Sequence, residues 1–136
     1  MKKNYVYIFL ILVVVSCSQN AVRKEVKESF EQIINSLKIE NSQKIDMLIP
    51  FLENKKEKEK SLFLIPFRKL IDTDYKLNIT KKSDKLYYIK VDTNNTDSLW
   101  SGIILPFELN QDGNWVMAPI INMVQTFEIV PAKKLE

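Results

Sequence analysis

The sequence lacks histidine and contains only one cysteine and two glycines, and each shortage excludes a class of functional site. Without imidazole there is no histidine base, proton shuttle or metal ligand. A zinc site needs several nitrogen or sulfur ligands, and a phosphate-binding loop needs more glycine than Gly102 and Gly113 supply. The single cysteine, Cys17, also excludes a disulfide framework within the chain. We therefore expect no cofactor and no zinc.

The sequence also lacks a strong charge of either sign. The formal net charge is +3, and once Lys2 and Lys3 are set apart with the N-terminal segment, 18 basic and 17 acidic side chains remain. These charges alternate along the chain and form no basic stripe, so we expect no nucleic-acid partner. A length of 136 residues with 46% apolar residues is typical of a single globular domain.

The N-terminal segment "MKKNYVYIFLILVVVSC" has the layout of a secretory signal. Two lysines precede an uncharged apolar run, residues 5–15, and the small residue Ser16 follows it. A helix of that length spans about 16 Å, which is well short of the roughly 30 Å hydrocarbon core of a bilayer. We therefore predict that residues 1–16 are a signal peptide and that the rest of the chain is exported.

The quartet Val14-Val15-Ser16-Cys17 resembles the bacterial lipobox. The resemblance implies that the Cys17 sulfur receives a diacylglycerol, that signal peptidase II cuts between Ser16 and Cys17, and that the new Cys17 amine can be acylated too. Two or more acyl chains hold a protein stably on a membrane. Membrane lipid, attached through Cys17, is therefore the first predicted partner. The alternatives are an uncleaved signal anchor and an ordinary signal peptide beside which Cys17 is incidental.

The predicted location is a bacterial cell envelope. The abundance of Lys, Ile and Asn is typical of AT-rich codons, and hence of a low-GC bacterium. Ser18, and not aspartate, follows the cysteine, which by resemblance to enteric lipoprotein sorting favours the outer membrane in a host with two membranes. We interpret residues 17–20 as a lipidated tether that reaches at most about 14 Å, so the domain is expected to lie against the bilayer.

The first half of the exported chain has helical periodicity. Apolar residues recur at steps of three and four from Val22 to Leu37, with Asn20 as the predicted N-cap and an end between residues 38 and 41. A second helix is expected after Ser42 and should stop near Ile49, because Pro50 follows. Residues 53–60 are interpreted as a solvated helical turn that leads into an apolar helix with a kink or break at residue 65.

After residue 72 the apolar period changes from 3.6 to 2, which predicts strands over residues 74–80, 85–91, 99–109 and 115–122, with 124–130 continuing or adding one. "KKSD" and "NQDGN" are predicted turns. Helices followed by an antiparallel meander predict an α+β domain over residues 21–131, with helices packed on a curved sheet of four or more strands. Residues 132–136 are a C-terminal tail.

This element order, together with the turn Asp112-Gly113-Asn114-Trp115, resembles the nuclear transport factor 2-like superfamily, and in particular its small bacterial lipoproteins. The resemblance implies a conical cavity between helices and sheet, in which some members carry an Asp or His base for isomerase or cyclase chemistry. Pro50 and Pro66 depart from the family's helical half. A cystatin-like fold is the alternative.

A carboxylate is the one base that this composition allows for such chemistry, and Asp72, Asp74 and Glu108 are nearest to the apolar segments. Strand alternation predicts an exposed Glu108, and "DTNNTD" lacks the glycine and glutamate of a calcium loop. The candidate partner-facing or pocket residues are Trp100, which is out of phase with its strand's apolar face, and Tyr88. We therefore expect a non-enzymatic binding or assembly component whose partner is an envelope protein or a small apolar ligand. The alternatives are a small cavity enzyme and a structural subunit without ligand.

Overall fold

The computed structural model describes residues 3–94, 100 and 103–120, with side chains from residue 17 onward. Three helices pack against a four-stranded antiparallel open sheet, so the predicted α+β fold, with helices first and sheet second, is confirmed. The elements follow in the order α1 (Lys3–Lys38), α2 (Ser42–Leu48), a short 3-10 helix η1 (Pro50–Leu52), α3 (Glu57–Arg68), β1 (Tyr75–Ser83), β2 (Leu86–Thr93), β3 (Ile104–Leu109) and β4 (Trp115–Met117).

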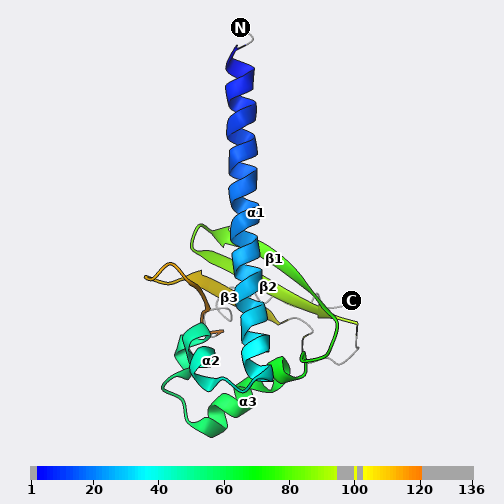
Figure 1. The fold of residues 1–136 in the computed structure, drawn as a ribbon, viewed down its shortest axis with the longest axis vertical. Coiled ribbons are helices and arrows are strands. Elements are labelled where there is room, and N and C mark those ends of the chain that lie inside the picture. The colour runs from blue at the N-terminus through cyan, green and yellow to red at the C-terminus, as the bar shows by residue number, and fades with distance from the viewer. Residues whose placement is uncertain (1–2, 95–99, 101–102, 121–136) are drawn as a thin grey trace, which may run out of the picture.

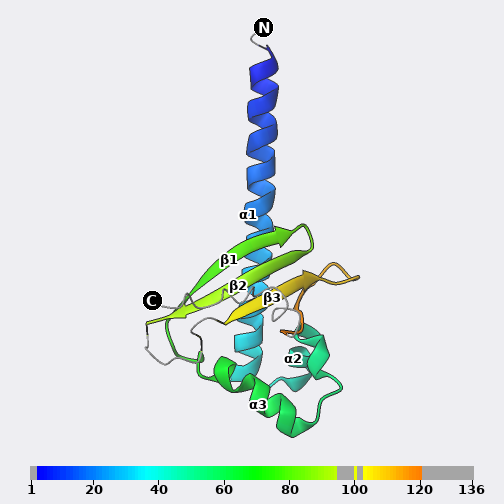
Figure 2. The ribbon, with the colours of Figure 1, turned by 180° about the vertical axis from the view of Figure 1, so that it is seen from behind.

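The sheet is a simple meander in which each strand pairs with the next, in the order β1-β2-β3-β4. Tyr87 in the second strand faces Lys81 of β1 and Phe107 of β3. The helix α1 crosses one face of this sheet and extends far beyond it at the N-terminal end (Figures 1 and 2). The helices α2 and α3 lie together at the opposite end of the domain (Figure 1).

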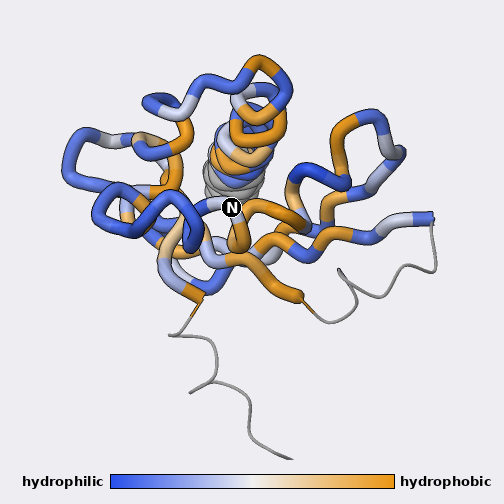
Figure 3. The backbone as a smooth tube through the Cα atoms, turned by 90° about the horizontal axis from the view of Figure 1, so that it is seen from below, coloured by the Kyte–Doolittle hydropathy of each residue, from blue (hydrophilic) through white to orange (hydrophobic). Residues whose placement is uncertain are grey.

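The core lies between α1, the sheet and the two shorter helices. Phe30 is fully buried on α1, and its ring meets Tyr75 of β1 at 5.8 Å, Phe67 of α3 at 6.3 Å and Phe107 of β3 at 6.5 Å between centroids. Burial of aromatic side chains is the largest single contribution to such a core. Seen along α1, many of the outer loops are hydrophilic and hydrophobic stretches run through the centre (Figure 3).

The helix α1 ends in a Schellman motif. Glu40 has a positive φ of 53°, the Glu40 amide donates to the Leu37 carbonyl, and the Asn41 amide donates to the Ser36 carbonyl. This end agrees with the prediction. The next helix is capped by Asn41, whose side chain accepts from the Lys44 amide at 3.1 Å, and not by Ser42 as predicted.

Pro50 and Pro66 act differently in the structure. The helix α2 stops before Ile49, as Pro50 predicted. Pro66, in contrast, lies inside α3, so of the predicted kink or break at residue 65 the break is wrong. Proline removes one donor, here the one that would bond to the Leu62 carbonyl. Because the Leu62 side chain is 58% exposed, water can reach this side of the helix.

Residues 53–60 form a turn and then the start of α3 at Glu57, so only the second half of this charged segment is helical. The predicted turn "NQDGN" is confirmed, with Gly113 at a φ of 80°. In the third predicted strand, β3 begins only at Ile104. Trp100 lies in a short 3-10 turn outside that strand, and the predicted strand over residues 124–130 falls outside the described residues.

Candidate functional site

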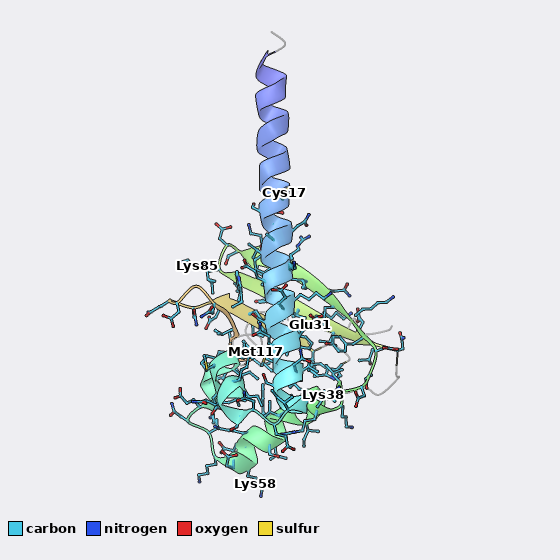
Figure 4. All side chains as sticks on the ribbon, viewed as in Figure 1. Cys17, Glu31, Lys38, Lys58, Lys85 and Met117 are labelled. Carbon is cyan, nitrogen blue, oxygen red and sulfur yellow. The ribbon has the colours of Figure 1, made fainter. Side chains whose placement is uncertain are left out.

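Cys17, the predicted lipidation site, is exposed on α1 near the point where this helix leaves the domain (Figure 4). The helix is continuous from Lys3 to Lys38, so the predicted N-cap at Asn20 is wrong, and residues 17–20, the predicted lipidated tether, are helical in this structure. Helix formers on both sides of Asn20 carry the helix through it, because an N-cap residue starts a helix only where the preceding backbone is not already helical. Val14, Val15 and Ser16 lie on the same helix, in the part described for its backbone alone.

The helix connects Cys17 directly to the core. Val22 is partly buried against the core and Val26 is fully buried, so the first packed residue lies five positions after Cys17. At a rise of 1.5 Å per residue this separation is about 8 Å along the helix axis. A group attached to Cys17 is therefore held close to the domain, and by a helix instead of a flexible chain.

Trp100, predicted to face a partner or a pocket, is buried within the domain. Its side chain is only 5% exposed, its ring meets Phe67 of α3 edge-on at 5.2 Å, and its Nε1 donates to the Pro66 carbonyl at 3.2 Å. The prediction rested on strand alternation, which does not apply in a 3-10 turn. The indole instead packs in the core against α3. Its N–H donates to a carbonyl of that helix, which satisfies the hydrogen bond that a buried Trp N–H requires.

Tyr88 lies on the sheet face opposite to Tyr87, as their adjacency predicted. Tyr87 is 2% exposed and packs edge-on against Trp115 at 5.2 Å, whereas Tyr88 is half-buried. The Lys82 ammonium lies 5.1 Å from the centroid of the Tyr88 ring, a cation–π contact. Tyr88 is therefore accessible, but its ring is already partly covered by a lysine.

The acids considered as catalytic bases are all on the surface. Asp72, Asp74 and Glu108 are exposed, and the Asp72 carboxylate lies 3.5 Å from the Lys38 ammonium. The exposed Glu108 is the outcome that strand alternation predicted. Among the residues that the structure describes, no cluster of His, Cys, Asp and Glu could hold a metal ion.

The described side chains with shifted pKa values are Tyr75 and the pair of Lys81 and Asp84. Burial raises the pKa of the Tyr75 phenol, and the nearby Glu31 charge raises it further. At the β1–β2 turn, the hydrogen bond from Lys81 lowers the pKa of the Asp84 carboxyl, and the same bond raises the pKa of Lys81. Asp84 is 92% exposed, so this pair belongs to the surface and not to a cavity.

Two hollows were not anticipated from the sequence. One, of about 230 Å³, lies between α2 and α3, where Lys60 is bonded to both Asp46 oxygens at 3.0 Å and Arg68 lines the wall. The other, of about 550 Å³, is an open groove between α1 and β1 beside Glu31 and Tyr75. The spacing of charges in the sequence carried no signal for the Asp46–Lys60 pair, because its members are 14 residues apart on different helices.

Comparison of the chain with protein-family models, with curated proteins and with solved structures gives no match. Across the part of the chain that the structure describes, no helix has both the length and the apolar character needed to cross a membrane.

Proposed function

We propose that this protein is a lipid-anchored component of a bacterial cell envelope, and that its α+β domain is a non-enzymatic binding or assembly module. The observation that carries the proposal is the position of Cys17. The sole cysteine follows an apolar segment in the lipobox quartet Val14-Val15-Ser16-Cys17, and its side chain is exposed. Diacylglycerol on an exposed sulfur can enter the bilayer without disturbing the core.

The proposed processing is compatible with the fold. Cleavage between Ser16 and Cys17 removes the part of α1 that precedes Cys17 and leaves a helix from Cys17 to Lys38. Among the α1 side chains that the structure describes, those buried against the core begin with Val22, after the cut. The mature domain therefore keeps all the core contacts that the structure describes for α1.

A binding role is favoured over catalysis by the surface. The carboxylates Asp72, Asp74 and Glu108 are exposed, whereas a general base works in a site that excludes water. Large apolar side chains, in contrast, are exposed at the end of α1 and on α2 and α3, namely Ile39 and Met47 at 70%, Leu62 at 58% and Ile65 at 43%. These elements lie at the end of the domain opposite to Cys17 (Figures 1 and 4), which is the end that we propose faces other envelope proteins.

The anchor is tested by replacing Cys17 with serine. The full-length chain is produced in bacteria fed a clickable fatty acid, and labelling, mass and membrane association are measured. We expect the parent to carry the label and to lack residues 1–16, and Cys17→Ser to be unlabelled and uncut. Asn20→Ala, an exposed neighbour that leaves the thiol in place, is the matched control and should behave as the parent. A Cys17→Ser protein that is still cut and membrane-bound contradicts lipidation.

The binding role is tested by site-specific photocrosslinking in the native envelope. A crosslinking side chain at Met47 or Leu62 should give the same discrete product, because both positions lie at the proposed partner-facing end. The control position is Glu108, which is exposed on the sheet instead. If all three positions give the same weak and diffuse products, the alternative of a subunit without a specific partner at this end is favoured.

A further inference from the structure

The β1–β2 hairpin reaches the end of the domain from which α1 emerges, and it is basic there. Figure 1 shows the turn between β1 and β2 at this end, and Figure 4 places Lys85 on the side of the domain nearer to Cys17. The sequence across the tip is Lys81-Lys82-Ser83-Asp84-Lys85. We define these five residues as the hairpin tip.

The hairpin tip does not serve the core. The last four residues of β1 are all exposed, whereas its first half alternates between half-buried and exposed residues. The end of β1 is therefore exposed to solvent, although Tyr87 of β2, which pairs with Lys81, is buried. The one acid of the tip, Asp84, lies 2.8 Å from Lys81, which leaves the charges of Lys82 and Lys85 without an acidic partner among the described residues.

Further cations lie on α1 just after the proposed lipid. Arg23 and Lys24 are exposed within two turns of Cys17. Two acids follow on the same helix: Glu25 accepts a hydrogen bond from Trp115, and Glu28 pairs with Lys24 at 3.9 Å. On α1 the two cations thus lie nearer to Cys17 than the two acids, and the excess positive charge of this end lies at the hairpin tip.

The opposite end of the domain is also rich in lysine, but acids are interspersed there. The segment "ENKKEKEK", which follows η1 and includes the start of α3, contains four lysines and three acids. Lys58 lies at this far end in Figure 4. The far segment thus has more lysines than the hairpin tip but a smaller net charge, because the tip has three lysines and a single acid.

We infer that the hairpin tip, with Arg23 and Lys24, docks the domain onto the anionic headgroups of the membrane that holds the lipid. The inference rests on the proposed lipid anchor at Cys17. The short helical distance between Cys17 and the core keeps the tip near the bilayer, where each basic residue strengthens binding to anionic lipid on the order of fivefold. Docking of this kind fixes the domain's orientation and directs the end with α2 and α3 away from the membrane.

The test uses the mature lipidated protein, which begins at Cys17, reconstituted into vesicles. Because the lipid occupies Cys17, a cysteine introduced by Ser83→Cys is the only reactive thiol and takes a fluorophore at the hairpin tip. Lys58→Cys provides the matched label at the far end. The vesicles contain phosphatidylcholine alone or with about a third of phosphatidylglycerol, and a headgroup-attached quencher reports proximity.

We expect quenching at position 83 to be at least about twofold stronger in the anionic vesicles, and quenching at position 58 to be weak in both. Lys82→Gln combined with Lys85→Gln should remove the difference at position 83. The control pair Lys55→Gln and Lys56→Gln, which changes the net charge equally at the far end, should leave it intact. An ionic strength of about 1 M, where the screening length is about 3 Å, should also abolish it.

Two readouts separate this inference from the proposed anchor. Co-flotation of protein with vesicles measures the lipid anchor, and quenching measures docking. A protein that does not float contradicts the anchor and with it the docking. A protein that floats but shows equal quenching at position 83 in both kinds of vesicle, or in the parent and the hairpin variant, keeps the anchor and overturns the docking.

Discussion

The indole Nε1 of Trp115 donates a hydrogen bond to Oε2 of Glu25 at 3.2 Å, which joins β4 to α1 across 90 residues of sequence. Trp115 is 5% exposed, and Glu25 lies on the exposed face of α1. The bond therefore connects a buried indole to a carboxylate at the domain surface. This bond fastens the first turns after Cys17 to the sheet.

Removing the acceptor of this bond should weaken the domain modestly. We expect Glu25→Ala to lower the free energy of unfolding by about 1 kcal/mol, because a buried donor is left without its partner. Urea unfolding measures the change. Glu28→Ala removes an acid from the same helix, where its pairing with Lys24 is exposed, and should leave the midpoint unchanged. Equal effects of the two substitutions would contradict a specific role of the Trp115 bond.

Replacing Trp100 should be severe. We expect Trp100→Ala to cost about 3–5 kcal/mol, because it opens a cavity against Phe67 and leaves the Pro66 carbonyl without its donor. Thermal unfolding by circular dichroism measures the loss, which is a large part of the stability of a small domain. Tyr88→Ala, at a half-buried aromatic on the other sheet face, should cost far less. A Trp100→Ala protein as stable as the parent would restore the partner-facing interpretation.

Two ion pairs of similar geometry should differ in strength. The Asp46–Lys60 pair has side chains 27% and 16% exposed and joins α2 to α3, so Asp46→Ala leaves a partly buried ammonium unpaired. We expect a loss of about 1–3 kcal/mol in urea unfolding. The Lys81–Asp84 pair is shorter, at 2.8 Å, but Asp84 is 92% exposed, and Asp84→Ala should leave the midpoint unchanged. A larger loss of stability in Asp84→Ala than in Asp46→Ala would show that the distance within an ion pair, and not its exposure to solvent, determines its contribution to stability.

Glu40 occupies a position suited to glycine. Its φ of 53° at the C′ position of a Schellman motif strains a residue with a Cβ atom. Glu40→Gly should therefore raise the free energy of unfolding by about 0.5 kcal/mol, the strain relieved being larger than the entropy lost.

The counterpart of this change is Gly113→Ala in the β3–β4 turn. A Cβ atom there meets nothing within 4 Å, so the backbone φ of 80° is the sole obstacle. We expect a loss of about 1 kcal/mol. Urea unfolding should show that Glu40→Gly raises the free energy of unfolding and that Gly113→Ala lowers it, which supports strain at positive φ as the cause. A stabilising Gly113→Ala would refute it.

Tyr75 should make stability sensitive to alkaline pH. Burial, and secondarily the Glu31 charge, raise its pKa above 10.0 in the folded state. Below pH 10.0 the phenol is protonated in both states; above it, the unfolded chain ionises first, so stability falls as pH rises through the folded pKa. We expect Tyr75→Phe to flatten this decline in unfolding measured against pH, and Glu31→Gln to shift phenolate absorbance to lower pH. An equally steep decline in Tyr75→Phe would exclude Tyr75 as its source.

Most of the secondary structure was predictable because it depends on neighbours a few residues apart. The helical spacing from Val22 to Leu37, the alternation of Tyr87, Ile89 and Val91, and the turn at Gly113 all follow from local backbone geometry. The start of α1 was not predictable in the same way, because Asn20 is compatible with both a cap and a helix interior.

The residues of the candidate site also differ in whether neighbouring residues alone made them predictable. The proposed lipobox around Cys17 is a contiguous pattern, and it was predicted from four adjacent residues. Trp100 was misassigned because its burial depends on Phe67 and Pro66, which are more than 30 residues away, and on a 3-10 turn that its own segment does not indicate.

By itself the sequence determined the order of helices and strands, the turn at Gly113 and the position of the one cysteine, because these depend on side-chain period, backbone freedom and composition. Only the tertiary structure decided that Pro66 is accommodated within a helix, that Trp100 is buried and that Asp46 meets Lys60. It also brought the basic hairpin tip to the end of the domain that bears Cys17. These are contacts between distant segments, and their free energy depends on which surfaces the folded chain removes from water.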